Sequence, residues 1–92
     1  MPNAREHELH QLLLSVVRSL VDSPEEVAVE LLAAQEGTVF RVEANPSDVG
    51  RIIGKGGQTA RSLQAMVNAN AARNGHRIQV EIDRAPTAGH FN

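Results

Sequence analysis

The fold of this chain is decided by residues 48–57, which read Asp48-Val49-Gly50-Arg51-Ile52-Ile53-Gly54-Lys55-Gly56-Gly57. Val49, Ile52 and Ile53 are spaced so that they share one face of a helix. Three glycines in the next four residues strongly disfavour continuation of that helix. The pattern predicts a short helix that ends abruptly at a glycine-rich loop.

Helix signals lie on both sides of this loop. Before it, Asn45 can cap the short helix, Pro46 suits the first helical position, and Asp48 can return a hydrogen bond as the N3 carboxylate. After it, apolar and small side chains recur at helical spacing over residues 58–73. These are Ala60, Leu63, Met66, Val67 and Ala71. The loop is therefore expected to join two helices.

The remaining apolar patterns predict one more helix and three strands. Apolar residues recur every three or four positions over residues 5–21, which indicates an amphipathic helix. Residues 27–33 and 38–44 are rich in apolar and β-branched side chains and are separated by a turn that contains Gly37, so they should pair as antiparallel strands. Residues 77–83 alternate between polar and apolar side chains and are expected to form the third strand.

The order of these elements indicates an α+β fold. With three strands, the helices are expected to cover one face of a single mixed sheet. The second and third strands are joined through two helices, and such a crossover normally links parallel neighbours. We expect one domain over residues 5–84, with flexible termini at residues 1–4 and 85–92.

Charge is divided unevenly between the two halves of the chain. The formal net charge of the whole chain is −2. Residues 1–49 contain three basic and nine acidic side chains, a net charge of −6, whereas residues 50–92 contain six basic and two acidic ones, a net charge of +4. An anionic partner is therefore expected to dock on the second half, which holds the loop.

The composition argues against catalysis, metal binding and membrane insertion. The chain has no cysteine, which excludes disulfides, thiolate metal sites and a nucleophilic thiol. Ser15, Ser19 and Ser62 lie on predicted helices without a neighbouring His and acid, and His7 and His10 lack a third metal ligand. No apolar run approaches the roughly 20 residues of a membrane-spanning helix. We expect a cytoplasmic protein that is not an enzyme and uses no cofactor or metal.

A glycine-rich turn between helices brings backbone amides close to an anion, which makes nucleotide-binding motifs the first alternatives. A P-loop needs four residues between its first glycine and the Gly-Lys pair, but only three separate Gly50 from Gly54. A dinucleotide fingerprint needs a strand before its glycines, whereas residues 49–53 are expected to be helical. Neither motif fits.

Residues 48–57 instead closely resemble the signature of the KH family, in which a GxxG loop between two helices clamps the backbone of about four nucleotides. The resemblance covers residues 5–84, and the element order is that of the type II topology, helix–strand–strand–helix–helix–strand. The chain is similar in size to the small bacterial KH proteins of the KhpA kind. The resemblance implies a post-transcriptional, RNA-chaperone-like role on short single-stranded RNA, with low sequence specificity.

Carried over by position, the resemblance implies a clamp and an apolar floor. Gly54 and Gly57 are the expected ends of the loop, and Lys55 and Gly56 its phosphate-contacting tip. Ile52 and Ile53 are expected to form the floor on which bases lie, with a plain core role for both as an equal alternative.

The resemblance also implies the walls of a groove. Arg51 and Arg61 are expected to flank the floor with positive charge. Ile78 to Val80 are expected to form the far wall, with edge backbone groups available to bases. The chain has no Tyr or Trp, Phe40 is expected in the core and Phe91 in the C-terminal tail, so aromatic stacking cannot supply affinity. The implied binding is weak and salt-sensitive.

Protein partners are implied as well. Members of this family pair with themselves or with a larger KH protein of the KhpB (Jag) kind, so a homodimer or such a heterodimer is expected. A competing interpretation is a KH-fold scaffold for dimerisation with little RNA binding. In that interpretation Leu63, Met66 and Val67 could serve a two-fold helix interface as well as a core.

Overall fold

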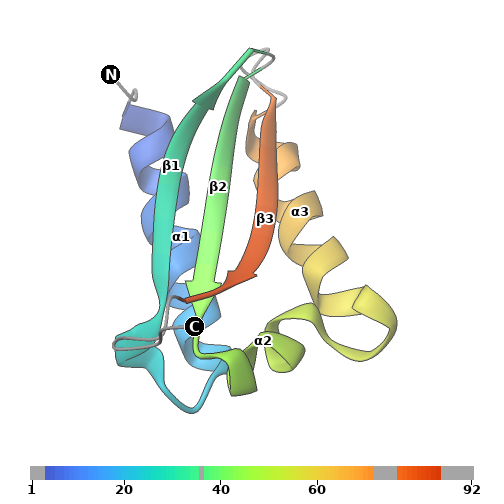
Figure 1. Cartoon of the computed structure of the whole chain (residues 1–92). Helices are drawn as coiled ribbons and strands as arrows, with labels where there is room; N and C mark the ends of the chain where they lie inside the picture. Colours follow the sequence, from blue (N-terminus) through green and yellow to red (C-terminus); the bar gives the residue numbers. More distant parts are fainter. Residues whose placement is uncertain (1–3, 36, 72–76, 86–92) are drawn as a thin grey trace.

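Helices pack against one face of a three-stranded sheet in the computed structural model, which describes residues 4–35, 37–71 and 77–85 (Figure 1). The helices are α1 (Ala4–Leu20), α2 (Pro46–Ile53) and α3 (Gln58–Ala71), and the strands are β1 (Ala28–Ala34), β2 (Gly37–Ala44) and β3 (Ile78–Arg84). Two short 3-10 turns, η1 (Pro24–Glu26) and η2 (Lys55–Gly57), precede β1 and α3. The predicted α+β order is confirmed.

The sheet has β2 at its centre. β1 pairs with β2 in antiparallel orientation, with Leu31 opposite Phe40, and β3 pairs with β2 in parallel, from Thr38 opposite Ile78 to Ala44 opposite Arg84. The predicted mixed sheet and parallel crossover are confirmed. As Figure 1 shows, α2, the glycine-rich loop and α3 make up this crossover, which leaves the free edge of β3 beside α3.

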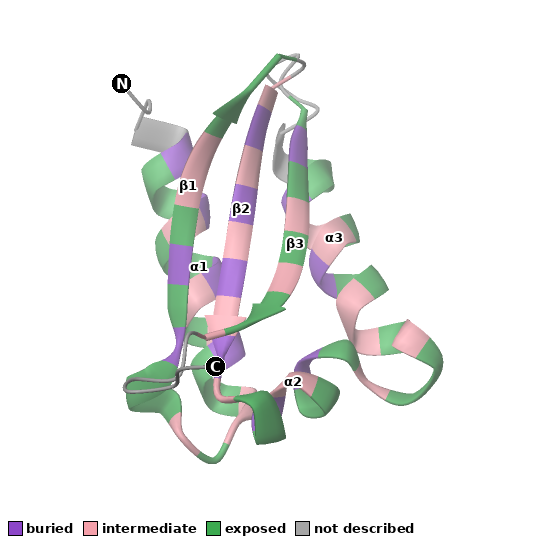
Figure 2. Cartoon of the chain, viewed as in Figure 1, coloured by how far each residue is buried: buried purple, intermediate pink, exposed green. Residues whose placement is uncertain are grey.

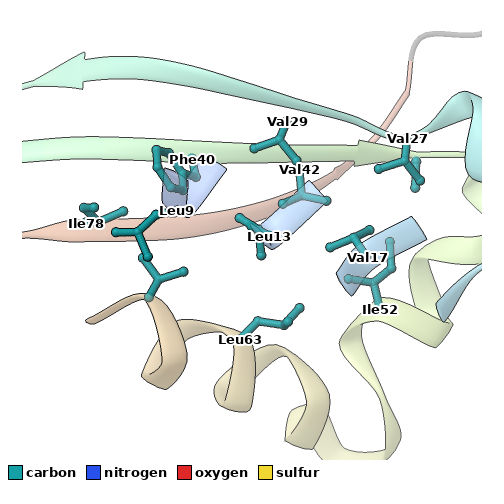
Figure 3. Packing of buried hydrophobic residues seen from close by; sticks show 12 residues of the cluster. Leu9, Leu13, Val17, Val27, Val29, Phe40, Val42, Ile52, Leu63 and Ile78 are labelled. Carbon is teal, nitrogen blue, oxygen red and sulfur yellow. The ribbon is translucent and has the colours of Figure 1, made fainter. Parts of the chain in front are cut away.

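The core lies between the sheet and the helices (Figure 3). Alternate residues of β2 are buried because successive strand side chains point to opposite faces (Figure 2). Phe40 is fully buried, as predicted, whereas Leu12, on the apolar side of α1, is 44% exposed. The buried apolar residues are Leu9, Leu13, Val17, Val27, Val29, Phe40, Val42, Ala44, Ile52, Leu63, Val67 and Ile78.

The opposite face of the sheet is acidic. Strand alternation places on it the side chains that are not directed toward the helices. Its charged residues are Glu30, Arg41, Glu43, Glu81 and Asp83. The ion pair between Arg41 and Asp83, at 3.4 Å, neutralises one of these acids. Four acidic residues against one arginine disfavour the approach of a polyanion to this face.

The expected domain limits stay a prediction. Ala4 is the first residue of α1, and the amide of Ala85 donates to the carbonyl oxygen of Ala44 at 2.7 Å. Residues 1–3, 72–76 and 86–92 lie outside the described residues, and with them the expected end of the third helix and most of both expected flexible termini.

Candidate nucleic-acid interface

The helix that leads into the glycine-rich loop begins with the predicted cap. The Asn45 side-chain oxygen accepts from the amide of Ser47 at 2.9 Å, and Pro46 occupies the first helical position. The Asn45 side-chain nitrogen donates to both carboxylate oxygens of Glu26, at 3.1 and 3.2 Å. The cap thus also ties α2 to the 3-10 turn before β1.

Asp48 has a different role from the one predicted. Its carboxylate does not serve the N-cap of its own helix but accepts from the backbone amides of Asp22, at 3.3 Å, and Ser23, at 3.1 Å. The carboxylate is reached by this turn because α2 packs close to the end of α1, and Asp48 is only 2% exposed. The prediction of a capping box is therefore wrong, and Asp48 fastens the α1–β1 connection to the start of α2.

The structure separates the two isoleucines that were predicted to act together. Ile52 is fully buried in the core, whereas Ile53 is 38% exposed at the last residue of α2. The difference follows from helix geometry, since consecutive residues are turned by about 100° around the axis. Ile52 therefore occupies a core position, and of the two side chains only that of Ile53 is exposed.

The loop departs from helical geometry at its glycines. Gly54, Gly56 and Gly57 have φ values of 78°, 63° and 77°, in the region that favours glycine. A Cβ on Gly54 would lie 2.3 Å from the Oγ1 of Thr59, so no other residue fits there without a shift, whereas a Cβ on Gly56 would meet nothing within 4 Å. The predicted break is confirmed, and the turn Lys55–Gly57 leads directly into α3.

The three predicted cations of the interface differ in their freedom. Arg51 forms ion pairs with Asp22 at 2.9 Å and with Asp48 at 3.8 Å, so much of its charge is compensated within the chain. Arg61 donates from Nη1 to the carbonyl oxygen of Gly56 at 2.9 Å, which braces the loop from α3. Lys55 is exposed and, within the described part of the chain, forms no ion pair.

The expected far wall of the groove is already occupied by a side chain. Gln64 of α3 donates from Nε2 to the carbonyl oxygen of Ile78 at 2.9 Å and accepts at Oε1 from the amide of Val80 at 2.8 Å. The edge groups that were expected to be available to bases are therefore bonded to Gln64. Ile78 itself is buried at 1% exposure, and Val80 is half-buried.

The helix stripe of the scaffold interpretation faces inward. Leu63 is 4% exposed and Val67 is fully buried, and Met66 packs partly buried against the same core. Two of the three residues are thus not accessible to a second chain. The stripe gives no support to an interface along that face of α3.

Other features of the described residues lie away from the loop. A cavity of about 200 Å³ lies at α1 and β1, lined by His7, His10, Gln11 and Leu31. His10 bonds through Nε2 to the carbonyl oxygen of Val29, and in residues 4–35, 37–71 and 77–85 no three His, Cys, Asp or Glu side chains form a metal-binding group. In the same residues, no helix is long and apolar enough to span a bilayer.

The sequence did not reveal two polar contacts near the loop. These are the bonds of Asp48 to the α1–β1 connection and the bonds of Gln64 to β3. Asp48 was recognised only as a local cap. For Gln64 the signal in the sequence was its polar side chain, three positions after Arg61 and therefore on the same side of the helix. The structure shows that this side chain reaches β3. Neither partner could be identified without the tertiary arrangement.

Known proteins with similar sequences agree with this architecture. The family model described as "KhpA/KhpB, KH domain" matches residues 10–82. A protein named RNA-binding protein KhpA from Leifsonia xyli subsp. xyli is 40% identical over 70 residues, which are 76% of this chain and 90% of the relative. Its namesake from Borreliella burgdorferi is 36% identical over 72 residues, 78% of this chain and 88% of the relative.

A third relative extends the match to almost its full length. The RNA-binding protein KhpA of Clostridium acetobutylicum is 34% identical over 74 residues, which are 80% of this chain and 99% of that protein. The helix order, the mixed sheet, the GxxG loop and these matches agree, and the chain belongs to the KhpA/KhpB family of KH-domain proteins.

Proposed function

We propose that this chain is an RNA-binding protein that clamps short single-stranded RNA at the loop formed by Gly54, Lys55, Gly56 and Gly57. The observation that carries the proposal is the loop itself, which holds an exposed Lys55 on a left-handed glycine turn directly before a 14-residue helix. The amide of Gln58, the first residue of this helix, bonds to the carbonyl oxygen of Lys55, and the helix dipole favours an anion at this end. The names of the relatives support the same function.

The remaining predicted residues enter this proposal unequally. Ile53 supplies exposed apolar surface beside the loop, and Arg61 supplies charge while it braces Gly56. Ile52 and Ile78 support the site from the core, and Arg51 contributes little charge because acids already pair with it. With so few free cations in the described residues, and with no Tyr or Trp in the chain, binding is weak and of low sequence specificity.

The proposal extends to the setting of this activity. We place the chain in the cytoplasm, where it acts on RNA in an RNA-chaperone-like manner. A partner of the KhpB kind is supported by the family model, which covers KhpA and KhpB together. A homodimer remains part of the proposal, with the interface on a surface other than the buried Leu63 and Val67.

The decisive test replaces the tip of the loop. The double variant Lys55→Asp/Gly56→Asp should weaken binding of a short fluorescent single-stranded RNA by more than about tenfold, because loss of one charge-assisted hydrogen bond removes about 1.5–3 kcal/mol. The fold should persist, since Lys55 is exposed, a side chain at position 56 meets open space, and Asp tolerates left-handed φ. Fluorescence anisotropy measures the affinity, and circular dichroism the fold.

A matched control carries the same change in net charge far from the loop. Gln11→Glu/Arg18→Asp places the new charges at exposed positions of α1. This control should keep most of the affinity. Wild-type log affinity should also fall with log salt by a slope of about 1.4, for two phosphate contacts from Lys55 and Arg61. Equal losses in the two double variants would show that overall charge, rather than the loop, governs binding.

A further inference from the structure

The start of the free edge of β3 is bonded to one side chain, that of Gln64. β3 pairs with β2 on its other side, so the carbonyl oxygen of Ile78 and the amide of Val80 point outward from the sheet. Gln64 satisfies both with a single carboxamide, at 2.9 and 2.8 Å. An exposed strand edge is a template for any group that offers a donor beside an acceptor, and Gln64 fills that template from within the chain.

A nucleobase edge has the same chemistry as this carboxamide. Adenine places an amino donor beside a ring-nitrogen acceptor, which is why glutamine and adenine can pair in a bidentate manner. The Nε2 and Oε1 atoms of Gln64 thus stand where an adenine amino group and ring nitrogen would bind Ile78 and Val80. The side chain and the base compete for the same two backbone groups.

The edge lies within reach of a strand held at the loop. Arg61 and Gln64 are three residues apart on one face of α3, and Arg61 contacts the loop through the carbonyl oxygen of Gly56. From the first residue of α3 to Gln64 the helix rises about 9 Å. That rise is within the span of the about four nucleotides that a loop of this kind clamps.

We propose that Gln64 is an internal competitor for base edges, so that an adenine reaches the β3 edge only by displacing the Gln64 carboxamide. The inference rests on the proposed RNA binding and adds to it the residue that sets base selectivity. It explains low selectivity by a contact that is present, in addition to the aromatic residues that are absent. Removing the carboxamide should expose a latent preference for adenine.

The test measures affinity for oligoadenylate and oligouridylate of equal length. Gln64→Ala should bind oligoadenylate about three- to tenfold more tightly than the wild type, since a base then forms hydrogen bonds without displacing a competitor. The ratio of the affinity for oligoadenylate to that for oligouridylate should therefore be higher in Gln64→Ala than in the wild type. The control is Gln11→Ala, which removes the same side chain from an exposed position of α1, and it should leave both affinities unchanged.

Hydrogen exchange at the amide of Val80 gives a readout that does not depend on affinity. In the free wild type this amide is protected by Gln64, and in Gln64→Ala it should exchange faster until oligoadenylate protects it again. If the alanine variant does not fold, Gln64→Met keeps the length of the side chain without its carboxamide and serves the same comparison.

Failure of this inference is distinct from failure of the proposed function. Suppose the Asp loop variant loses binding, but Gln64→Ala binds oligoadenylate no more tightly than the wild type. Suppose alternatively that oligoadenylate does not protect the Val80 amide of Gln64→Ala. Gln64 is then only a structural cover for the edge, and the RNA clamp stands. If the Asp loop variant binds like the wild type, the clamp itself is wrong, and the competition at β3 falls with it.

Discussion

The two ends of α2 use polar and apolar groups in opposite ways. At its start, Asn45 and Asp48 direct their side chains to other parts of the chain, where they hold the α1–β1 connection. At its end, Ile53 and Lys55 are exposed, and the backbone turns through left-handed glycines. α2, a helix of eight residues, is thus fastened to the rest of the chain at its start, whereas exposed side chains lie at its end.

The largest expected effect is a difference in the free energy of unfolding between alanine variants of the adjacent isoleucines Ile52 and Ile53. Ile52→Ala should lower the free energy of unfolding by about 2–5 kcal/mol, because it opens a cavity in the core. Ile53→Ala should change it by about 0.5 kcal/mol or less, as at other surface positions, while it weakens RNA binding. Urea denaturation and anisotropy measure the two quantities. Equal destabilisation by both substitutions would remove the distinction between a core and a ligand-facing residue.

A smaller effect is expected at the buried carboxylate. Asp48→Ala leaves the amides of Asp22 and Ser23 without their acceptor and should lower the free energy of unfolding by about 1–3 kcal/mol. The RNA affinity of the folded variant should stay near that of the wild type. Asp22→Asn is the matched control, because it removes only the exposed ion pair with Arg51 and should cost about 0–1 kcal/mol.

The outcome at Asp48 also decides what holds the connection. If Asp22→Asn were as destabilising as Asp48→Ala, the exposed ion pair and not the buried hydrogen bonds would fasten α2. If Asp48→Ala instead lost RNA binding while its thermal stability was unchanged, the start of α2 would belong to the ligand site, and the comparison between the two ends would fail.

The smallest effect is expected between the two ends, at Gly50. A Cβ there would meet nothing within 4 Å. Gly50→Ala should raise the free energy of unfolding by about 0.5–1 kcal/mol, the difference between these residues inside a helix. Gly54→Ala is its counterpart at the loop and should destabilise, because of its positive φ and its approach to Thr59. Thermal denaturation of both variants tests whether tolerance of a side chain changes abruptly at the end of α2.

Local patterns in the sequence were sufficient for the elements but not for the contacts between them. The cap at Asn45, the glycine break and the alternation of β3 depend on residues close in the chain, and each was predicted correctly. The partners of Asp48 are 25 and 26 positions away, and those of Gln64 are 14 and 16. Such contacts depend on how the helices dock, which periodicity does not specify.

Tertiary packing also decides which side of a helix is buried, and the sequence alone did not show this for α2. Ile52 and Ile53 have the same side chain and are neighbours, so composition could not distinguish them. Glu6 and Thr38 also form a buried hydrogen bond at 2.6 Å between α1 and β2, although acidic residues are most often found at the surface. A polar residue can be predicted to be buried only when its hydrogen-bond partner is known, and the partner of Glu6 could not be identified from the sequence.

The parallel pairing of β2 with β3 has a consequence for how the chain folds during its synthesis. The ladder joins residues far apart in the chain, from Thr38 opposite Ile78 onward, so the entropy of closing a long segment must be overcome before the pairing forms. On the ribosome, the hairpin of β1 and β2 is synthesised well before β3. β3 emerges from the ribosome after the glycine-rich loop and α3, so a nascent chain has its loop before it has the strand edge that Gln64 contacts.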